Sequence, residues 1–316
     1  MWQKARSQII TNPAELAVKL MLPAISVSEL TLKALPLRVP RCFIKRMQKG
    51  NLTDPLLKQI LPSSDEELSA DEFIVDPLAE KQSTVVPGVL HKYFGRVLLL
   101  VTNQCALNCR FCFRRGSKHS KINWQTALKY IASDPTITEV ILSGGDPLML
   151  EDETLARYIK KIAALRHVQY LRIHTRLPLI MPQRVNVNLI RALTQTRLLP
   201  VVVVHCNHPQ EINDEVRAAL FKLKKAGITL LNQSVLLHGI NDQPEILIKL
   251  SHALFKCGVL PYYLHLLDKV KGAQHFYVAP MRAKRIYAEL VKKLSGYLVP
   301  KLVKEIVGGY AKKRVG

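Results

Sequence analysis

The chain reads RVLLLVTNQCALNCRFC at residues 96–112, and this stretch decides how the rest of the sequence is interpreted. The apolar run at 96–102 is typical of a buried strand, and the polar residues after it end that strand. Cys105, Cys109 and Cys112 follow with C-x3-C-x2-C spacing. The sequence therefore predicts a strand that leads into a short loop with three thiols.

Three thiols on one loop favour an iron–sulfur ligand set over disulfides, because three is odd and the other cysteines are scattered. Four thiolates would complete a structural zinc site or a fully ligated cluster, whereas three leave one iron of a [4Fe–4S] cluster open to a small molecule. The spacing alone leaves two alternatives open, a zinc site completed by a distant histidine and three unrelated cysteines. Cys206 and Cys257 lie in apolar segments, where we expect them to pack as small hydrophobic residues.

Composition indicates a globular chain, large enough for one barrel domain or two smaller ones. The chain has 316 residues, 48% of them hydrophobic, and a formal net charge of +22. A solvated basic surface explains this charge as well as an anionic partner does, and no nucleic-acid-binding motif is present. The sequence shows no signal peptide and no apolar run of about 18 residues, so we expect a cytoplasmic protein without a membrane span.

Strand-like and helix-like segments alternate from residue 96 onward. The strands are expected at 96–102, 139–143, 170–175, 200–205, 229–234 and 261–266. The helices between them are expected at 124–133, 151–165, 187–196, 214–226 and 243–257. Consecutive β–α units form parallel strands with right-handed crossovers, so these six units predict an α/β fold with a partial barrel.

We expect three regions along the chain. Residues 1–83 are expected to form a helical N-terminal region, residues 84–279 the partial barrel, and residues 280–316 a C-terminal helix and tail. Residues 63–67 (SSDEE) form the most acidic patch of the first region, and we expect a solvated loop there.

Polar residues follow the ends of all six expected strands. Ligand-binding groups of parallel α/β folds lie at the C-terminal ends of the strands, so these residues are expected to converge on one mouth. They are the cysteine loop, residues 143–146, 174–176, 205–208 and 232–234, and His265 with Asp268.

The end of the second strand contains Ser143, Gly144, Gly145 and Asp146. Glycine has no Cβ, so a ligand can approach the backbone closely at this point. A tight turn before a helix cap would use the same residues, and the two interpretations stay open on this motif alone.

The cysteine motif resembles that of the radical S-adenosylmethionine (SAM) enzymes, and its flanks, VTNQC at 101–105 and CFRR at 112–115, resemble the lysine 2,3-aminomutase branch. The resemblance extends from about residue 36 to residue 313 and implies a partial (β/α)6 barrel. It implies that the three cysteines bind a [4Fe–4S] cluster, whose open iron binds SAM and whose electron cleaves SAM to a radical. It also implies that the segment at 143–146 contacts SAM.

The same resemblance implies a pyridoxal 5′-phosphate (PLP) site. Lys92, Tyr93 and Arg96 match the segment that binds the PLP phosphate in the family. Lys312 matches the lysine that holds PLP covalently, and Lys313 is a close alternative.

A site for lysine is implied as well. Arg114 matches the arginine that pairs with the substrate carboxylate, and Asp268 and Glu305 match two carboxylates that bind its side-chain ammonium. A buried ammonium needs such anions to offset the cost of losing its water. The residue types alone leave other interpretations open. Arg114 could be a cation beside an anionic cluster, and Asp268 and Glu305 could be two surface carboxylates.

The resemblance thus implies an isomerase that converts L-α-lysine to β-lysine. Residues 264–270 and the short C-terminus are most similar to the enzymes that supply β-lysine for elongation factor P, which implies a link to that factor and its lysyl-ligase. The implied partners are an electron donor such as flavodoxin or ferredoxin and, in a homo-oligomer, a second copy of the chain; direct binding of nucleic acid is not implied. Two alternatives stay open, a radical SAM aminomutase for another amino acid and a non-enzymatic Fe–S protein that binds RNA or a translation factor.

Overall fold

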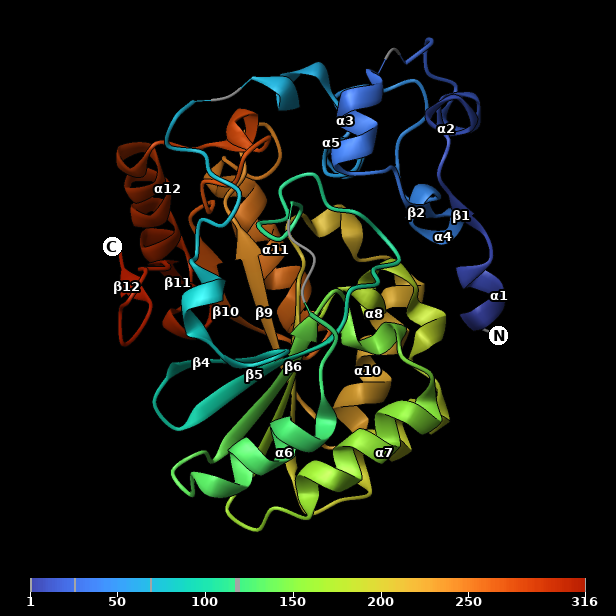
Figure 1. Ribbon diagram of the computed structural model, residues 1–316. Helices are drawn as coiled ribbons and strands as arrows, with labels where there is room; N and C mark the ends of the chain where they lie inside the picture. The colour runs from blue at the N-terminus through green and yellow to red at the C-terminus, as the bar shows by residue number, and fades with distance from the viewer. Residues whose placement is uncertain (1, 26, 69, 117–119, 316) are drawn as a thin grey trace.

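The computed structural model describes residues 2–25, 27–68, 70–116 and 120–315, and a ten-stranded sheet forms its centre (Figure 1). The order in the sheet is β12-β11-β10-β9-β8-β7-β6-β5-β4-β3. The strands are β3 (Thr84–Val86), β4 (Val89–Tyr93), β5 (Arg96–Thr102), β6 (Glu139–Gly144), β7 (Tyr170–Thr175), β8 (Leu199–Val204), β9 (Thr229–Val235), β10 (Leu260–His265), β11 (Lys301–Lys304) and β12 (Lys313–Arg314).

Strands β5 to β11 are parallel and neighbour one another in chain order, whereas β3, β4 and β12 pair antiparallel at the two ends of the sheet. This confirms the expected α/β fold with a partial barrel, and β5 to β10 are the six strands that the sequence predicted. The parallel strand β11 was not predicted. It has only four residues, and the exposed Lys301 and Lys304 at its ends leave just two buried side chains to form a hydrophobic pattern.

Long helices connect the parallel strands and cover the sheet on its outer side (Figure 1). A helix of this kind buries one apolar stripe, as α7 does with Leu155, Ile159 and Ile162. The helices are α6 (Trp124–Ser133), α7 (Asp152–Ala163), α8 (Leu177–Ile180), α9 (Val187–Thr194), α10 (Asp214–Lys225), α11 (Pro244–Lys256) and α12 (Pro280–Lys293). The five helices expected between strands are all present, with ends that differ by a few residues.

The regular structure of the N-terminal region consists of short helices and one small antiparallel pair of strands. Its elements are α1 (Trp2–Arg6), β1 (Ile9–Ile10), α2 (Pro13–Leu20), α3 (Glu29–Ala34), β2 (Val39–Pro40), α4 (Arg41–Ile44) and α5 (Pro55–Lys58). A hydrophobic cluster joins this region to the barrel, because Leu16, Phe43 and Leu56 are buried together with Leu107 of the cysteine loop and Ile180 of α8. The N-terminal region therefore packs directly against the cysteine loop and α8.

No helix in the described part of the chain is long and apolar enough to cross a membrane.

Candidate functional site

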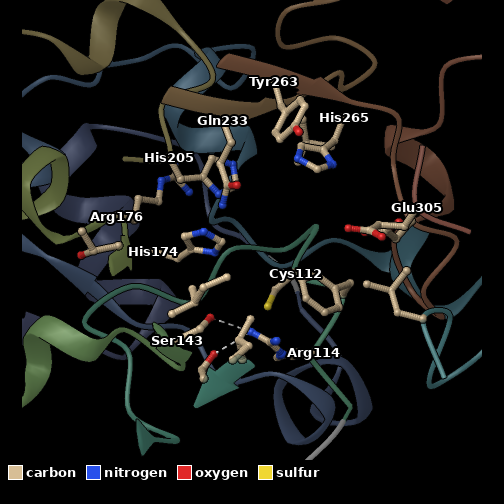
Figure 2. A pocket seen from close by; sticks show the side chains of 18 of the residues that line it. Cys112, Arg114, Ser143, His174, Arg176, His205, Gln233, Tyr263, His265 and Glu305 are labelled. Atoms are coloured by element: carbon tan, nitrogen blue, oxygen red, sulfur yellow. Dashed lines mark hydrogen bonds between the residues drawn. The ribbon is translucent and has the colours of Figure 1, made fainter. Parts of the chain in front are cut away.

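A cavity of about 480 Å³ lies within the curve of the sheet. Side chains two residues apart on one strand point to the same face, so Arg172 and His174 of β7 and Tyr263 and His265 of β10 all line it. Figure 2 shows His174, His205 and His265 around this space, with Cys112 and Glu305 at its border. Of the site residues predicted from the sequence, these also line it: Lys92, Tyr93, Arg96, Cys105, Cys109, Arg114, Ser143, Gly144, Gly145, Asp146, Asp268 and Lys312.

The three cysteines of the loop are free, half-buried thiols that line this cavity. Burial raises the pKa of the Cys105 thiol well above its ordinary value and the pKa of Cys112 to about 11. Both thiols are therefore neutral at pH 7 unless a metal or another cation stabilises the thiolate. Cys206 and Cys257 are fully buried among apolar side chains, as expected.

The N-terminal region fixes the backbone of the cysteine loop. Arg38 Nε donates to the carbonyl of Cys105 at 3.1 Å, and Asn108 Nδ2 donates to the carbonyl of Pro36 at 2.8 Å. The backbone N–H of Arg110 donates to the carbonyl of Gln59 at 2.9 Å. These bonds hold the loop at several points along its length.

The prediction of a solvated loop at residues 63–67 was wrong, because Glu66 is buried. Residues Ser64–Glu67 form the 3-10 helix η1, and Glu66 is buried. Its carboxylate accepts from Arg110 Nε at 2.7 Å and Nη2 at 2.5 Å, and also from Arg115 Nη2. An acidic run in a sequence usually indicates a solvent-exposed loop. Here the two arginines in and beside the cysteine loop are buried, and they need a buried carboxylate to balance their charges.

The two glycines at the end of β6 are required by the cysteine loop itself. Gly144 has φ +113°, and a Cβ there would lie 2.5 Å from the carbonyl oxygen of Thr102. A Cβ on Gly145 would lie 2.4 Å from the carbonyl oxygen of Gln104. The backbones of β6 and of the cysteine loop therefore lie in direct contact, and only glycine fits between them.

Asp146 connects the ends of β6 and β7. Its carboxylate accepts from Thr175 Oγ1 at 2.7 Å, from the backbone N–H of Arg176 at 2.8 Å and from that of Leu177 at 3.0 Å. It also accepts from the backbone N–H of Leu148 at 3.0 Å. These contacts give Asp146 a structural task in addition to the cofactor contact expected from the sequence.

Arg114 forms an ion pair that the sequence did not suggest. Its Nε and Nη2 donate to the carboxylate of Glu80 at 2.9 and 2.6 Å, and its Nη1 donates to Ser143 Oγ and the carbonyl of Gly144, both at 3.2 Å (Figure 2). Glu80 belongs to no recognisable motif and precedes Arg114 by 34 residues, so only the fold reveals it. The pair fixes the guanidinium at the cavity wall.

The C-terminal segment places Lys312 in the cavity and leaves Lys313 exposed in β12. Glu305 connects this segment to β4, because its carboxylate accepts from Lys312 Nζ, from Lys92 Nζ at 3.0 Å and from Tyr93 OH at 2.5 Å. Burial lowers the pKa of Lys312 to about 8. The carboxylate of Asp268 opposes this shift, and the positive charge of Lys92 adds to it. A substantial fraction of this amine is neutral near pH 8.

Asp268 is the carboxylate that opposes this shift. Burial raises the pKa of Asp268 to about 6, although Lys312 and Lys92 favour its charged form. It is therefore ionised at pH 7. The guanidinium of Arg96 lies 4.7 Å from the ring centre of Tyr93, which keeps a further cation beside Lys92 and Tyr93.

Arg172 is a second residue that the sequence interpretation missed. It lines the cavity and pairs with Glu139 of β6, with 2.9 Å between Nε and Oε1. The alternation of β7 could have revealed it, because Arg172 and His174 lie two residues apart and share one face. Among the described residues the buried Nε2 of His174 has no hydrogen-bond partner, so the wall retains polar capacity for a ligand.

Comparison with known proteins identifies the superfamily of this chain, because residues 99–250 match the model of the Radical SAM superfamily. The chain is 48% identical over 315 residues to L-lysine 2,3-aminomutase of Escherichia coli K12, which covers 97% of this chain and 92% of the relative. The Haemophilus influenzae L-lysine 2,3-aminomutase is also 48% identical, over 97% of this chain and 93% of its own. The Clostridium subterminale enzyme of the same name is 36% identical, over 90% of this chain and 69% of its own.

The chain therefore belongs to the lysine 2,3-aminomutase family of radical SAM proteins. Membership implies three cofactors, a [4Fe–4S] cluster and SAM from the superfamily and PLP from the aminomutases, in agreement with the sequence prediction.

The residues present fit these groups. Among the described residues, no three His, Cys, Asp or Glu side chains are arranged around a single metal ion. A [4Fe–4S] cluster needs no such arrangement, because each thiolate binds a different iron. Lys92 and Arg96 offer cations for a phosphate, and Lys312 offers a reactive amine to an aldehyde.

Proposed function

We propose that this chain converts L-lysine to β-lysine, with each cofactor and the substrate held by residues of the one cavity. The observation that supports this best is that one cavity brings together three groups of residues from distant parts of the sequence. They are the three thiols, the low-pKa Lys312, and the charged set formed by Arg114, Asp268 and Glu305. When bound, the cluster and SAM supply a carbon-centred radical, and PLP supplies a conjugated ring that stabilises an unpaired electron.

Cys105, Cys109 and Cys112 are proposed as the cluster ligands. Their loop leaves the barrel wall at the C-terminal end of β5, where parallel α/β folds place their reactive groups. The close contact of Gly144 and Gly145 with this loop keeps the thiols beside the proposed SAM segment.

Lys312 is proposed to hold PLP covalently before substrate binds. An amine attacks an aldehyde only in its neutral form, and a pKa of about 8 makes that form accessible near neutral pH. Lys313 is exposed and does not line the cavity, which favours Lys312 of the two candidates. Lys92, Tyr93 and Arg96 are proposed to bind the phosphate through two cations and a phenol.

The substrate is proposed to lie between Arg114 and the carboxylates of Asp268 and Glu305. The Glu80 pair fixes the Arg114 guanidinium at the cavity wall, where its positive charge would attract a substrate carboxylate. Asp268, ionised at pH 7, attracts an ammonium at the other end of the substrate. Burial around both ends excludes water from the reacting carbons.

A role in the modification of elongation factor P is proposed from the sequence alone, and residues 264–270 are its support. The β-lysine would be transferred by a separate lysyl-ligase, and a flavodoxin or ferredoxin would supply the electron.

The test is anaerobic reconstitution followed by incubation with SAM, PLP and either L-lysine or L-glutamate. We expect β-lysine from L-lysine and no β-glutamate, since Asp268 and Glu305 repel a second substrate carboxylate. Equal turnover of both amino acids would contradict the substrate assignment. A protein that binds neither iron nor PLP would contradict the proposed function as a whole.

A further inference from the structure

Arg176, at the end of β7, contacts one of the three cluster cysteines directly. Its Nη1 donates to Cys109 Sγ at 2.8 Å. The side chain is buried against the cavity, and its guanidinium carbon lies 5.8 and 5.6 Å from the ring centres of Phe43 and Phe111. One of the three thiols thus has a fixed, charged N–H donor at hydrogen-bond distance.

The arginine is held from its other side by Glu211 and Gln59. Its Nη2 donates to Glu211 Oε2 at 2.9 Å and to Gln59 Oε1 at 2.5 Å. Glu211 is fully buried and accepts the backbone N–H groups of Asn207 at 2.9 Å and His208 at 3.1 Å. Rotation of the Arg176 side chain away from Cys109 would break its bonds to Glu211 and Gln59.

A third nitrogen of Arg176 indicates a further acceptor. Its Nε is buried, and it has no hydrogen-bond partner among the described residues. Buried N–H groups are almost always paired in folded proteins. A cluster bound to Cys109 would bring inorganic sulfide, which accepts hydrogen bonds, to this side of the cavity.

We propose that Arg176 is a positioning residue that sets the reduction potential of the [4Fe–4S] cluster through the Cys109 thiolate. Hydrogen bonds to cluster sulfurs withdraw negative charge and stabilise the reduced state, which has one more electron, so they raise the potential. Glu211 limits this effect, because its negative charge offsets that of Arg176. The inference rests on the proposed function, since it assumes a cluster on the three cysteines.

A purely structural task for Arg176 makes a different prediction. An arginine that only joins Gln59 and Glu211 would affect stability and leave the potential unchanged. The cluster proposal requires opposite shifts from its two charged members. Loss of Arg176 should lower the potential, and loss of the Glu211 charge should raise it.

The experiment uses the full chain, reconstituted anaerobically and analysed for iron and sulfide. The [4Fe–4S] reduction potential is then measured without SAM by a redox titration that EPR monitors. We expect the cluster of Arg176→Gln to be at least tenfold harder to reduce than that of the wild type. For a one-electron couple this corresponds to a reduction potential that is lower by about 59 mV or more. Arg176→Lys should recover part of this difference, and Glu211→Gln should shift the potential in the opposite direction.

The matched control is Arg184→Gln. Arg184 is also fully buried in an ion pair, with Asp152 at 2.6 Å, but it does not line the cavity. Its loss should affect stability and leave the potential at the wild-type value.

Three results would overturn the inference. The first is an unchanged potential in Arg176→Gln at full iron content. The second is a shift of the same sign in Arg176→Gln and Glu211→Gln, which would indicate general loosening of the site. If Arg176→Gln binds no iron, the third is a wild-type reduction potential in Arg176→Lys at full iron content. A wild-type chain that binds no cluster would instead contradict the proposed function itself.

Discussion

Replacing Glu66 with alanine should destabilise the protein and loosen the cysteine loop at the same time. The Glu66 side chain is 2% exposed, and its two partners, Arg110 and Arg115, are 0% and 5% exposed. Arg110 lies between Cys109 and Cys112 in the sequence, so its position affects both thiols. The Glu66→Ala change removes the only carboxylate bonded to either guanidinium in the described part of the chain.

The magnitude follows from the cost of a buried charge without its partner. Removing one member of a buried ion pair costs about 3–5 kcal/mol, and the upper end applies because two arginines share Glu66. The remaining bonds to backbone carbonyls, such as Arg110 Nη1 to Leu35 at 2.6 Å, offset part of this cost. For a large domain each kcal/mol lowers the Tm by about 2 °C, so we expect a decrease of roughly 6–10 °C.

The assay is thermal unfolding of the purified protein, combined with its iron content after reconstitution. Asp65→Ala is the control, because Asp65 lies in the same 3-10 helix but is exposed and accepts only a 3.1 Å bond from Ser63 Oγ. We expect Asp65→Ala to change stability by about 0.5 kcal/mol or less and to bind the wild-type amount of iron.

Two outcomes would refute this reasoning. A Tm of Glu66→Ala within about 1 °C of the wild-type value would mean that the buried network adds no stability. A large Tm decrease with full iron content would mean that the network stabilises the fold without holding the cysteine loop.

Three further predictions concern Lys312 and Asp268. Borohydride reduction of the PLP-loaded protein should label Lys312, and Lys312→Ala should abolish a label that Lys313→Ala retains; peptide mapping that places it on Lys313 would contradict this. Covalent PLP uptake should increase as pH rises through about 8, because the pKa of Lys312 is lowered to that value and only the neutral amine reacts; an increase only near pH 10 would contradict it. Lysine binding, measured by calorimetry, should weaken as pH falls through about 6, where Asp268 becomes protonated, and Asp268→Asn should weaken it at pH 7 by roughly 3–5 kcal/mol while SAM binding stays unchanged; equal loss of both ligands would contradict this assignment.

The sequence predicted the barrel strands well because their signals are local. A short apolar run bounded by polar turns, as in β5, β6 and β8, specifies a buried strand from its own composition. Strand β11 lacks that signal, since its four residues alternate too briefly between exposed lysines and buried side chains. Its place in the sheet depends on pairing with β10, which is a tertiary contact.

The site was predictable where the residues belong to one compact motif. The cysteine loop and the two glycines at the end of β6 are such motifs, and both line the cavity. The partners of the site arginines were not predictable, because each lies far away in the sequence. Glu66 is 44 residues from Arg110, and Glu80 is 34 residues from Arg114.

These partners share a location that clarifies how the protein is organised. Glu66, Glu80 and Gln59 all belong to residues 1–83, and each binds an arginine beside the cysteine loop or at the end of β7. The chain has 46 Lys and Arg against 24 Asp and Glu, and the N-terminal region supplies the carboxylates that pair with Arg110, Arg114 and Arg115. Without that region Arg110, Arg114 and Arg115 would lose the carboxylates of Glu66 and Glu80 that neutralise their charges, which is energetically unfavourable. The position of the cysteine loop therefore depends on residues on both sides of residue 83.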